Sequence, residues 1–447
     1  MQFPITLLNA LKNAKGFQEA PFLQVHQSGE QVTSIRINPF KSIAPFPDLS
    51  SAIPWAEAGQ YLSQRPSFTF DPLFHAGCYY VQEASSMFIE QIFKQQIDLS
   101  KTIKVLDLCA APGGKSTHIQ SLISKDSLLV SNEVIKSRAG ILKDNIIKWG
   151  CENVIVTQND PQDFLKLENY FDVVVVDAPC SGSGLFRRDA EAINEWSEKN
   201  VTHCSFRQQR ILNDVWPALK KNGILIYSTC SFSTEENEAM VNWLKNNFNA
   251  SSLSLSIPDE WQIVESDGGY RFWPHRVKGE GFFVAAIRKQ DGDSGIYKKN
   301  KNVVSKTSKP EQELVNDWAK TENSCIIKNQ QTVYAWPSSL FEEMNYVLQN
   351  LRVIYSGVLA GELLRDKFIP AHALALSNLI STTVKKVSLS KEQAIAYLQK
   401  KDFILNTSEK GWVLATYSGF SIGWMNILQN RINNYYPKEL RIFKEKE

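Results

Sequence analysis

The sequence predicts an α/β fold: a doubly wound, Rossmann-like sheet with a small N-terminal α/β unit before it and a C-terminal α+β region after it. Short, nearly continuous apolar runs recur between about residues 75 and 290, as strands covered on both faces require. The spacers between these runs are long enough for crossover helices, which favours parallel strands. Several strands end in acids or cysteines, so we expect a ligand site at the carboxyl edge of the sheet.

Composition limits the class of protein. The chain has 447 residues, of which 43% are hydrophobic, as is typical of a globular protein. Its net charge is only +2, so a basic surface that binds a polyanion would have to be a local patch. Residues 1–16 do not resemble a signal peptide, and no run approaches the roughly 18 apolar residues of a membrane span. None of the 7 cysteines forms a CxxC pair, which argues against a zinc site or a disulfide framework. We expect a cytoplasmic monomer with reduced thiols, no metal and no membrane partner.

The first two units follow from their strand patterns. Residues 1–70 form a small α/β unit, in which residues 31–38 alternate as a strand and Pro39 ends it. Residues 71–290 form the main sheet domain, whose last strand has little helix before it and is expected to be antiparallel. Its strands are expected at residues 105–108, 128–133, 153–156, 171–177, 223–229 and 282–287.

Three further segments follow the sheet domain. Residues 291–310 are a lysine-rich linker, interpreted either as a solvated tether or as a phosphate-contacting segment. Residues 311–380 form an accessory domain and residues 381–447 a small β-rich module. In that module a capping box at Ser390 predicts a helix, and residues 411–417 and 419–424 predict a strand pair around a turn.

A turn of small residues follows the strand at 105–108. Small side chains let a bulky ligand contact the backbone, and Ser116 and Thr117 can start the next helix. The turn matches neither GxGxxG nor the P-loop pattern, which disfavours dinucleotides and nucleoside triphosphates. The cofactor-binding residues are therefore expected in the run Cys109, Ala110, Ala111, Pro112, Gly113, Gly114, Lys115.

Acids end three successive strands beyond this turn. Glu133 is placed to bind two ribose hydroxyls, Asp160 to receive an adenine amino group, and Asp177 to face the middle of the ligand. A ligand with ribose, adenine and a positive charge is S-adenosylmethionine, whereas a nucleotide phosphate would be repelled. Taken singly, each acid is better explained as a cap or a surface residue; together, as a set of strand ends, they predict the cofactor.

Two apolar strands end in cysteines, Cys180 and Cys230, which the sheet brings to the same edge as the glycine turn. Two thiols beside a cofactor suit a covalent sulfur intermediate. The alternative is a pair of buried packing cysteines.

The chain resembles the Nop/Sun family of RNA cytosine-5 methyltransferases over roughly residues 20–290. The resemblance implies that Cys230 is the nucleophile and that Cys180 aids product release. It also implies that Asp177 binds the activated base or the cofactor's charged end, while Lys115 orients the base or favours the thiolate; Cys109 is interpreted as structural. The reversed order, with Cys180 attacking as in DNA cytosine methyltransferases, stays open. The matching segments are residues 107–115, 177–184, 227–232, 235–238, 79–86, 271–275 and 279–283.

RNA is the expected partner. Cytosine carbon 5 becomes nucleophilic when a thiolate adds to carbon 6, and the base must be unpaired or flipped to reach such a site. Arg187, Arg188 and His275 are candidate phosphate or base contacts, and residues 34–38 resemble the family's RNA-facing segment. The tail resembles the F subgroup of bacterial ribosomal RNA methyltransferases, which carries a PUA-like module; the matching segments are residues 361–362, 368–375, 423–424 and 434–441.

We therefore expect methylation of small-subunit ribosomal RNA. The alternatives are a transfer RNA cytosine-5 methyltransferase and a non-catalytic RNA-binding ribosome assembly factor.

Overall fold

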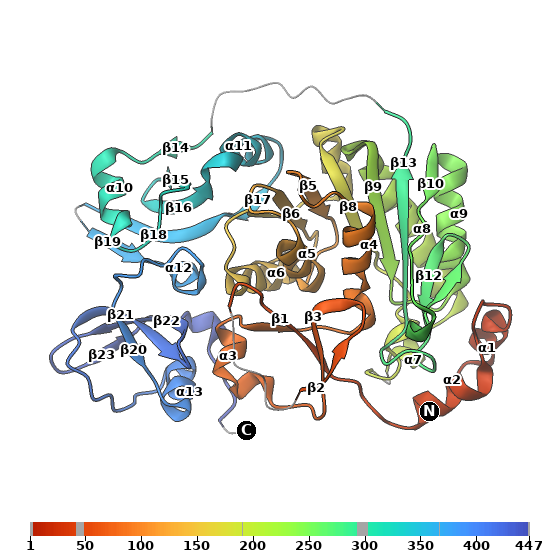
Figure 1. The fold of residues 1–447 in the computed structure, drawn as a ribbon, viewed down its shortest axis with the longest axis horizontal. Coiled ribbons are helices and arrows are strands. Elements are labelled where there is room, and N and C mark those ends of the chain that lie inside the picture. The colour runs from red at the N-terminus through yellow and green to blue at the C-terminus, as the bar shows by residue number, and fades with distance from the viewer. Residues whose placement is uncertain (1–2, 42–48, 190, 293–302, 366, 446–447) are drawn as a thin grey trace.

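The main body is a ten-stranded sheet in the order β11-β12-β13-β9-β8-β5-β6-β7-β17, with β10 paired to β13 (Figure 1). The computed structural model describes residues 3–41, 49–189, 191–292, 303–365 and 367–445. The central strands are parallel, as predicted. They are β5 (Lys104–Asp107), β6 (Leu128–Asn132), β7 (Val154–Thr157), β8 (Phe171–Asp177) and β9 (Leu219–Thr229).

Helices cover both faces of these strands, which is why the strands are apolar throughout. Successive side chains alternate, so Val173 and Val175 join the core on one face, while Val174 and Val176 join the core on the other. On the first face lie α4 (Ile89–Gln96), α5 (Gly114–Leu122) and α6 (Lys136–Trp149); on the second lie α8 (Glu198–Val215) and α9 (Glu238–Asn247) (Figure 1).

Antiparallel strands extend the sheet at both edges. β13 (Phe282–Lys289) pairs antiparallel with β9, which confirms the predicted late strand. At the other edge β17 (Val353–Ser356) pairs antiparallel with β7, a strand that the sequence did not reveal. The remaining strands on the β13 side are β12 (Gly269–Phe272), β11 (Val264–Ser266) and β10 (Ala250–Ser252).

The N-terminal part packs against the start of α5. Its sheet has the order β2-β3-β1-β4, so β1, which the sequence predicted, is an interior strand. Arg36 on β1 is 0% exposed, donates to Thr117 Oγ1 at 2.6 Å and stacks on Trp149. The expectation that this segment faces RNA is therefore wrong for Arg36, because its side chain is enclosed by protein. The elements are α1 (Ile5–Leu11), α2 (Glu19–Gln27), β1 (Ser34–Ile37), β2 (Leu49–Ile53), β3 (Ala56–Leu62), α3 (Pro72–His75) and β4 (Tyr79–Val81).

The ends of the lysine-rich stretch belong to secondary-structure elements of the neighbouring units. Lys289 is the last residue of β13 and donates to two backbone carbonyls, and Lys309 begins α10. Residues 293–302 lie outside the described residues. An antiparallel five-stranded sheet follows, in the order β14-β15-β16-β18-β19. Its elements are β14 (Ser305–Lys306), α10 (Lys309–Asn316), β15 (Ser324–Asn329), β16 (Thr332–Pro337), α11 (Phe341–Asn350), β18 (Val358–Leu364), β19 (Lys367–Pro370) and α12 (His372–Leu376).

The last unit is a four-stranded sheet with one helix. The capping box at Ser390 starts α13 (Lys391–Gln399), and β21 (Gly411–Tyr417) pairs with β22 (Phe420–Ile427), both as predicted. β20 (Lys386–Ser388) and β23 (Ile432–Asn434) complete it.

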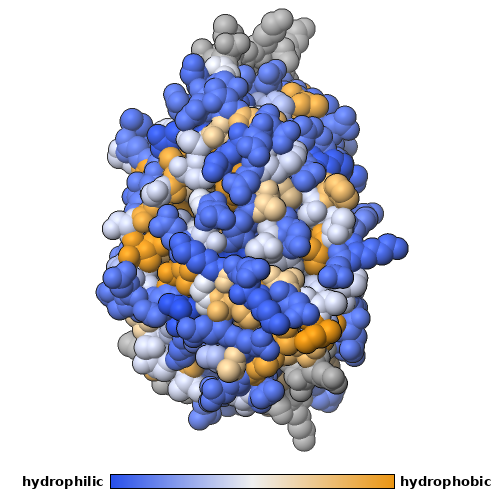
Figure 2. Space-filling model, turned by 90° about the vertical axis from the view of Figure 1, so that its right-hand side faces the viewer, coloured by the Kyte–Doolittle hydropathy of each residue, from blue (hydrophilic) through white to orange (hydrophobic). Residues whose placement is uncertain are grey.

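One face of the molecule is mostly polar. Figure 2 shows one face covered largely by hydrophilic residues, with apolar residues in small separate groups. Within the residues that the structure describes, every helix is too short or too polar to cross a bilayer.

Candidate active site

The glycine turn is held in place by buried backbone hydrogen bonds. Asn132, at the end of β6, donates to the carbonyls of Leu108 and Asn159, and its own carbonyl accepts from Ala110 N at 2.8 Å. Gly113 has a φ of +114°, a conformation that favours glycine, and α5 begins directly after it at Gly114. The helix therefore starts before Ser116 and Thr117, which were expected to begin it.

Ser116 instead serves the strand before the turn. Its hydroxyl donates to Asp107 Oδ2 at 2.6 Å, and Asp107 is 0% exposed. Burial raises the pKa of Asp107 to about 7, against its ordinary value of 3.8. Asp107 is thus a buried support of the turn, and it does not line either cavity described below.

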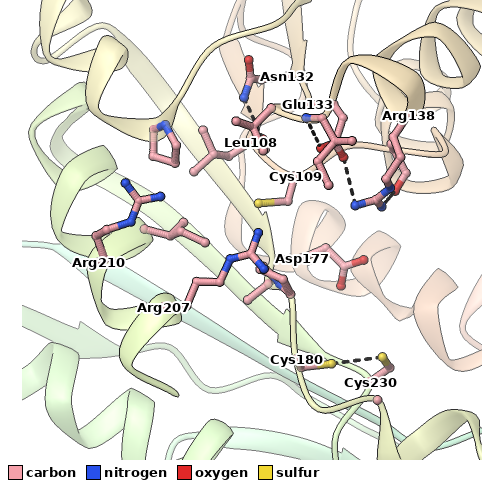
Figure 3. Close-up of a pocket in the computed structure, with 18 of the residues that line it drawn as sticks. Leu108, Cys109, Asn132, Glu133, Arg138, Asp177, Cys180, Arg207, Arg210 and Cys230 are labelled. Carbon is pink, nitrogen blue, oxygen red and sulfur yellow. Dashed lines mark hydrogen bonds and ion pairs between the residues drawn. The ribbon is translucent and has the colours of Figure 1, made fainter. Parts of the chain in front are cut away.

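A first cavity of about 260 Å³ lies at the carboxyl ends of β5, β6 and β8 (Figure 3). Glu133 lines it with a nearly buried side chain that accepts from Ile135 N at 2.9 Å and pairs with Arg138 at 3.3 Å. Cys109, Ala111 and Asp177 line it as well. The cavity therefore holds a buried acid one strand away from the glycine turn, as predicted.

Asp160 lies outside this lining. Its carboxylate is 3.2 Å from Arg210 of α8 and accepts from Gln162 N, capping the short 3-10 segment Pro161–Leu167. Pro161 and Arg210 do line the cavity. The contact expected between Asp160 and an adenine amino group stays a prediction, in competition with the Arg210 ion pair.

A second cavity of about 350 Å³ adjoins the first. Lys115 and the turn residues Ala110, Pro112 and Gly114 line it, whereas Gly113 lines neither cavity. The residues common to both linings are Cys109, Ala111, Asp177, Leu185 and Cys230. Two binding spaces therefore meet at the end of β8 and at the Cys230 thiol.

The two predicted thiols are adjacent. Cys180 Sγ lies 3.1 Å from Cys230 Sγ, and both cysteines are free. The hydrogen bond to Cys230, together with burial, raises the pKa of Cys180 well above its ordinary value. Cys180 therefore holds its proton near neutral pH and can donate it in a hydrogen bond to the Cys230 sulfur. Burial raises the pKa of Cys109 as well, which keeps that thiol neutral.

Asp177 is fixed between the two cavities. Lys115 Nζ lies 2.8 Å from its carboxylate, and Ser228 donates to it at 2.7 Å. The same lysine lies 5.1 Å from the ring centroid of Phe282, which lines the second cavity. Lys115 and Asp177 therefore act as one paired unit on the wall of the second cavity.

The three residues that were expected to contact RNA lie in different surroundings. Arg188 lines the second cavity. Arg187 is nearly buried and donates to the backbone carbonyls of Glu30 and Gly279, and His275 packs near Trp273 outside both linings. Of these three residues, Arg188 alone lines one of the two cavities described above.

Sequence reasoning missed the arginines of the first cavity. Arg207 and Arg210 come from α8 and Arg138 from α6, and all three line it (Figure 3). The spacing of three between Arg207 and Arg210 places them on one helix face. The sequence shows this spacing, but it does not show that this face of α8 points toward the first cavity.

Three family models match the chain. A model of the 16S rRNA methyltransferase RsmB/F matches residues 95–288, a model of the N-terminal domain of 16S rRNA methyltransferase RsmF matches residues 3–84, and one of the methyltransferase RsmF PUA domain matches residues 384–442.

Curated relatives match along most of their length. The ribosomal RNA small subunit methyltransferase F of Psychromonas ingrahamii is 31% identical over 87% of this chain and 85% of its own length. The protein of the same name from Vibrio vulnificus is 31% identical over 91% of this chain and 90% of its own length.

Solved structures share the fold. A methyltransferase homolog from Pyrococcus horikoshii superposes with a TM-score of 0.51 and 27% identity over 64% of this chain and 99% of that chain. NSun6 from Pyrococcus horikoshii, solved with SFG, gives a TM-score of 0.52 and 20% identity over 65% of this chain and 99% of that chain. Both confirm the Rossmann-like architecture.

Proposed function

We propose, because this chain belongs to the RsmF family of 16S ribosomal RNA methyltransferases, that it transfers a methyl group from S-adenosylmethionine to carbon 5 of a cytosine in small-subunit ribosomal RNA. The observation that carries the proposal is the 3.1 Å thiol pair: Cys230 lines both cavities where they meet, and Cys180 lines the first. A methyl donor in the first cavity and a base in the second would face each other at the end of β8 and the Cys230 thiol, where the two cavities meet.

The residues of the first cavity fit the cofactor. Glu133 is an acid that lines the cavity and is suited to ribose hydroxyls, and Val134, Ile135 and Pro161 give apolar surface suited to an adenine ring. Asp177, which lines both cavities, would balance the positive charge of the sulfonium. When bound, S-adenosylmethionine supplies an electrophilic methyl group.

The chain's own residues supply the nucleophile and the base. The Cys230 thiol loses its proton to solvent and its sulfur adds to carbon 6 of cytosine. The double bond between carbons 5 and 6 opens, which makes carbon 5 an enamine carbon able to take the methyl group. Lys115 and Asp177 orient the base at the second cavity's wall. Carbon 5 then loses its proton, the ring regains its double bond, and the bond from Cys230 to carbon 6 breaks.

Cys180 is the base for that last step. While Cys230 is a free thiol or thiolate, its hydrogen bond raises the pKa of Cys180. Once Cys230 is a thioether on carbon 6, its contribution to the raised pKa of Cys180 is reduced, while burial and the nearby Glu236 still raise that pKa. The thiolate form of Cys180, reached by loss of its proton to solvent, then lies beside the adduct and takes the proton from carbon 5.

Cysteine variants test the assignment. Cys230→Ala is expected to abolish both methylation and any covalent protein–RNA adduct, while Cys180→Ala is expected to accumulate the adduct. Denaturing gels with labelled ribosomal RNA measure this. Cys204→Ala is the matched control, since Cys204 lies on α8 outside both cavities. An adduct formed by Cys230→Ala would reverse the roles of the two thiols.

Bisulfite sequencing of total RNA, from cells with and without the protein, identifies the substrate RNA. We expect one or more cytosines of small-subunit ribosomal RNA to lose protection when the protein is absent. Loss of cytosine protection in transfer RNA alone would support the alternative of a transfer RNA methyltransferase. Failure to bind S-adenosylmethionine in calorimetry would support a non-catalytic assembly factor.

A further inference from the structure

We propose that Glu236 is a positioning residue that sets the distance between the two thiols by tying the Cys180 loop to the Cys230 loop. Its catalytic consequence rests on the proposed function, whereas the thiol spacing is measurable without RNA. Glu236 belongs to the short 3-10 segment Thr234–Glu236, touches neither cavity and is 0% exposed.

The carboxylate of Glu236 accepts hydrogen bonds from both loops. Ser181, the residue after Cys180, donates through its backbone N at 2.8 Å and through Oγ at 2.5 Å. Ser231, the residue after Cys230, donates through Oγ at 2.5 Å. One buried side chain is therefore bonded to the immediate neighbours of both thiols.

Glu236 is itself anchored to two elements of the main domain. Gln208 of α8 donates to its carboxylate at 3.1 Å and to the carbonyl of Pro179 at 3.0 Å. Tyr227 of β9 donates to the backbone carbonyl of Glu236 at 2.6 Å. Glu236 is thus attached to the sheet through Tyr227 and to α8 through Gln208.

Buried charge makes this clamp strong and costly to break. A charge-assisted hydrogen bond is roughly twice as strong as a neutral one, and a buried acceptor left without donors keeps its full desolvation cost. Burial raises the pKa of Glu236, and the donors from Ser181, Ser231 and Gln208 oppose that rise. The two loops are therefore held together by the donors that satisfy this carboxylate.

The two chemical steps depend on the clamp differently. Adduct formation uses the Cys230 sulfur alone, whereas release needs Cys180 within reach of carbon 5 while Cys230 is bound to carbon 6. A displacement of about 1 Å at a reacting group costs on the order of 100-fold in rate. Loss of Glu236 should therefore slow release more than adduct formation.

The first test measures thiol spacing without RNA. Two adjacent thiols lose two protons and two electrons to the added oxidant diamide, whose N=N bond becomes a hydrazine as one S–S bond forms. The rate is followed by mass spectrometry of the Cys180–Cys230 peptide pair. Glu236→Ala is expected to slow this disulfide at least about tenfold. Glu236→Gln should recover most of the rate, because the two serine hydroxyls can rotate to accept from the amide.

The matched control is Glu235→Ala, the exposed neighbour, which should oxidise like the wild type. If Glu236→Ala does not fold, Ser231→Ala removes the side-chain bond from the Cys230 loop and is expected to slow the disulfide in the same assay. Ser181→Ala removes the hydroxyl bond of the Cys180 loop but keeps its backbone N–H bond, so a smaller effect is expected. Wild-type oxidation rates in all the folded variants would overturn the proposal.

The second test concerns catalysis. Glu236→Ala is expected to accumulate the covalent RNA adduct, with a lower kcat and an unchanged KM for S-adenosylmethionine, because Glu236 does not line the cofactor cavity. A uniform loss of both steps would contradict a positioning role in release. Slow oxidation together with no adduct in any variant, the wild type included, would leave the clamp in place and refute the proposed chemistry.

Discussion

Three acids that end neighbouring strands have different local partners, and these partners decide what each acid can bind. Glu133 and Asp177 line the first cavity, while Asp160 is paired with Arg210 outside it. All three acids lie at or just after the end of a strand, so this position alone does not distinguish them. Each acid instead has a different cation from a different helix: Arg138 of α6 pairs with Glu133, Lys115 of α5 with Asp177, and Arg210 of α8 with Asp160.

Glu133→Gln tests the cofactor contact. The amide keeps the side chain's shape but weakens charge-assisted hydrogen bonds to ribose hydroxyls, which are worth roughly 1.5–3 kcal/mol. We expect the affinity for S-adenosylmethionine, measured by calorimetry, to fall about tenfold or more. The control is Glu168→Gln, an exposed acid outside the lining. Unchanged affinity would remove Glu133 from the cofactor site.

Asp107→Asn tests the buried acid beneath the turn. The pKa of Asp107 is raised to about 7 in the folded chain from an ordinary 3.8. Between these two pH values the unfolded chain releases a proton that the folded chain keeps, so the free energy of unfolding falls as pH rises through this window. The loss amounts to roughly 4 kcal/mol at most.

Asparagine cannot titrate, so Asp107→Asn should gain stability relative to the wild type between pH 4 and pH 7. Urea titrations at both pH values measure this gain, and Asp259→Asn, at an exposed position, serves as the reference variant. A stability difference that does not change with pH would show that Asp107 is ionised in the fold.

At the scale of elements, three loops meet at one glycine. A Cβ at Gly184 would lie 2.5 Å from the carbonyl oxygens of both Cys230 and Gly281. Both obstacles are backbone atoms, so a side chain there must displace a loop. The end of β9, the loop after β8 and the start of β13 are thus in direct backbone contact around the thiols.

Gly184→Ala is accordingly expected to shift the Cys230 loop and to lower kcat/KM on the order of 100-fold. Methyl incorporation into ribosomal RNA measures the effect. Gly140→Ala on α6 is the matched control, because a Cβ there meets nothing within 4 Å and alanine is favoured in helices. Equal activity of the two variants would mean that the loop tolerates displacement.

At the scale of the whole molecule, the C-terminal half is built into the main sheet. β17 adds an edge strand beside β7, and Met344 of α11, 0% exposed, joins the same apolar cluster as Phe164 and Leu167. Tyr170 donates to the backbone carbonyl of Glu343. The methyltransferase sheet and the segment after the linker therefore share one core.

Met344→Ala should destabilise this shared core by about 2–5 kcal/mol. Because the cluster belongs to both halves, we expect one thermal transition shifted to lower temperature, observed by calorimetry. Glu342→Ala, exposed on the same helix, should leave the transition unchanged. A second, separate transition that carries all of the shift would show that the C-terminal half unfolds independently.

The sequence by itself determined the parallel strands, the glycine turn and the placement of Cys180 and Cys230 at one edge, because local apolar runs and strand ends obey rules of short range. Only the tertiary structure decided that Arg36 is buried, that Asp160 pairs with Arg210, that β17 closes the far edge and that Glu236 joins the two thiol loops. Each of these depends on contacts between residues far apart in the chain or on the direction of a helix face. Hydrophobic periodicity predicts which face of an element is buried, but it does not predict which distant residue a side chain will contact.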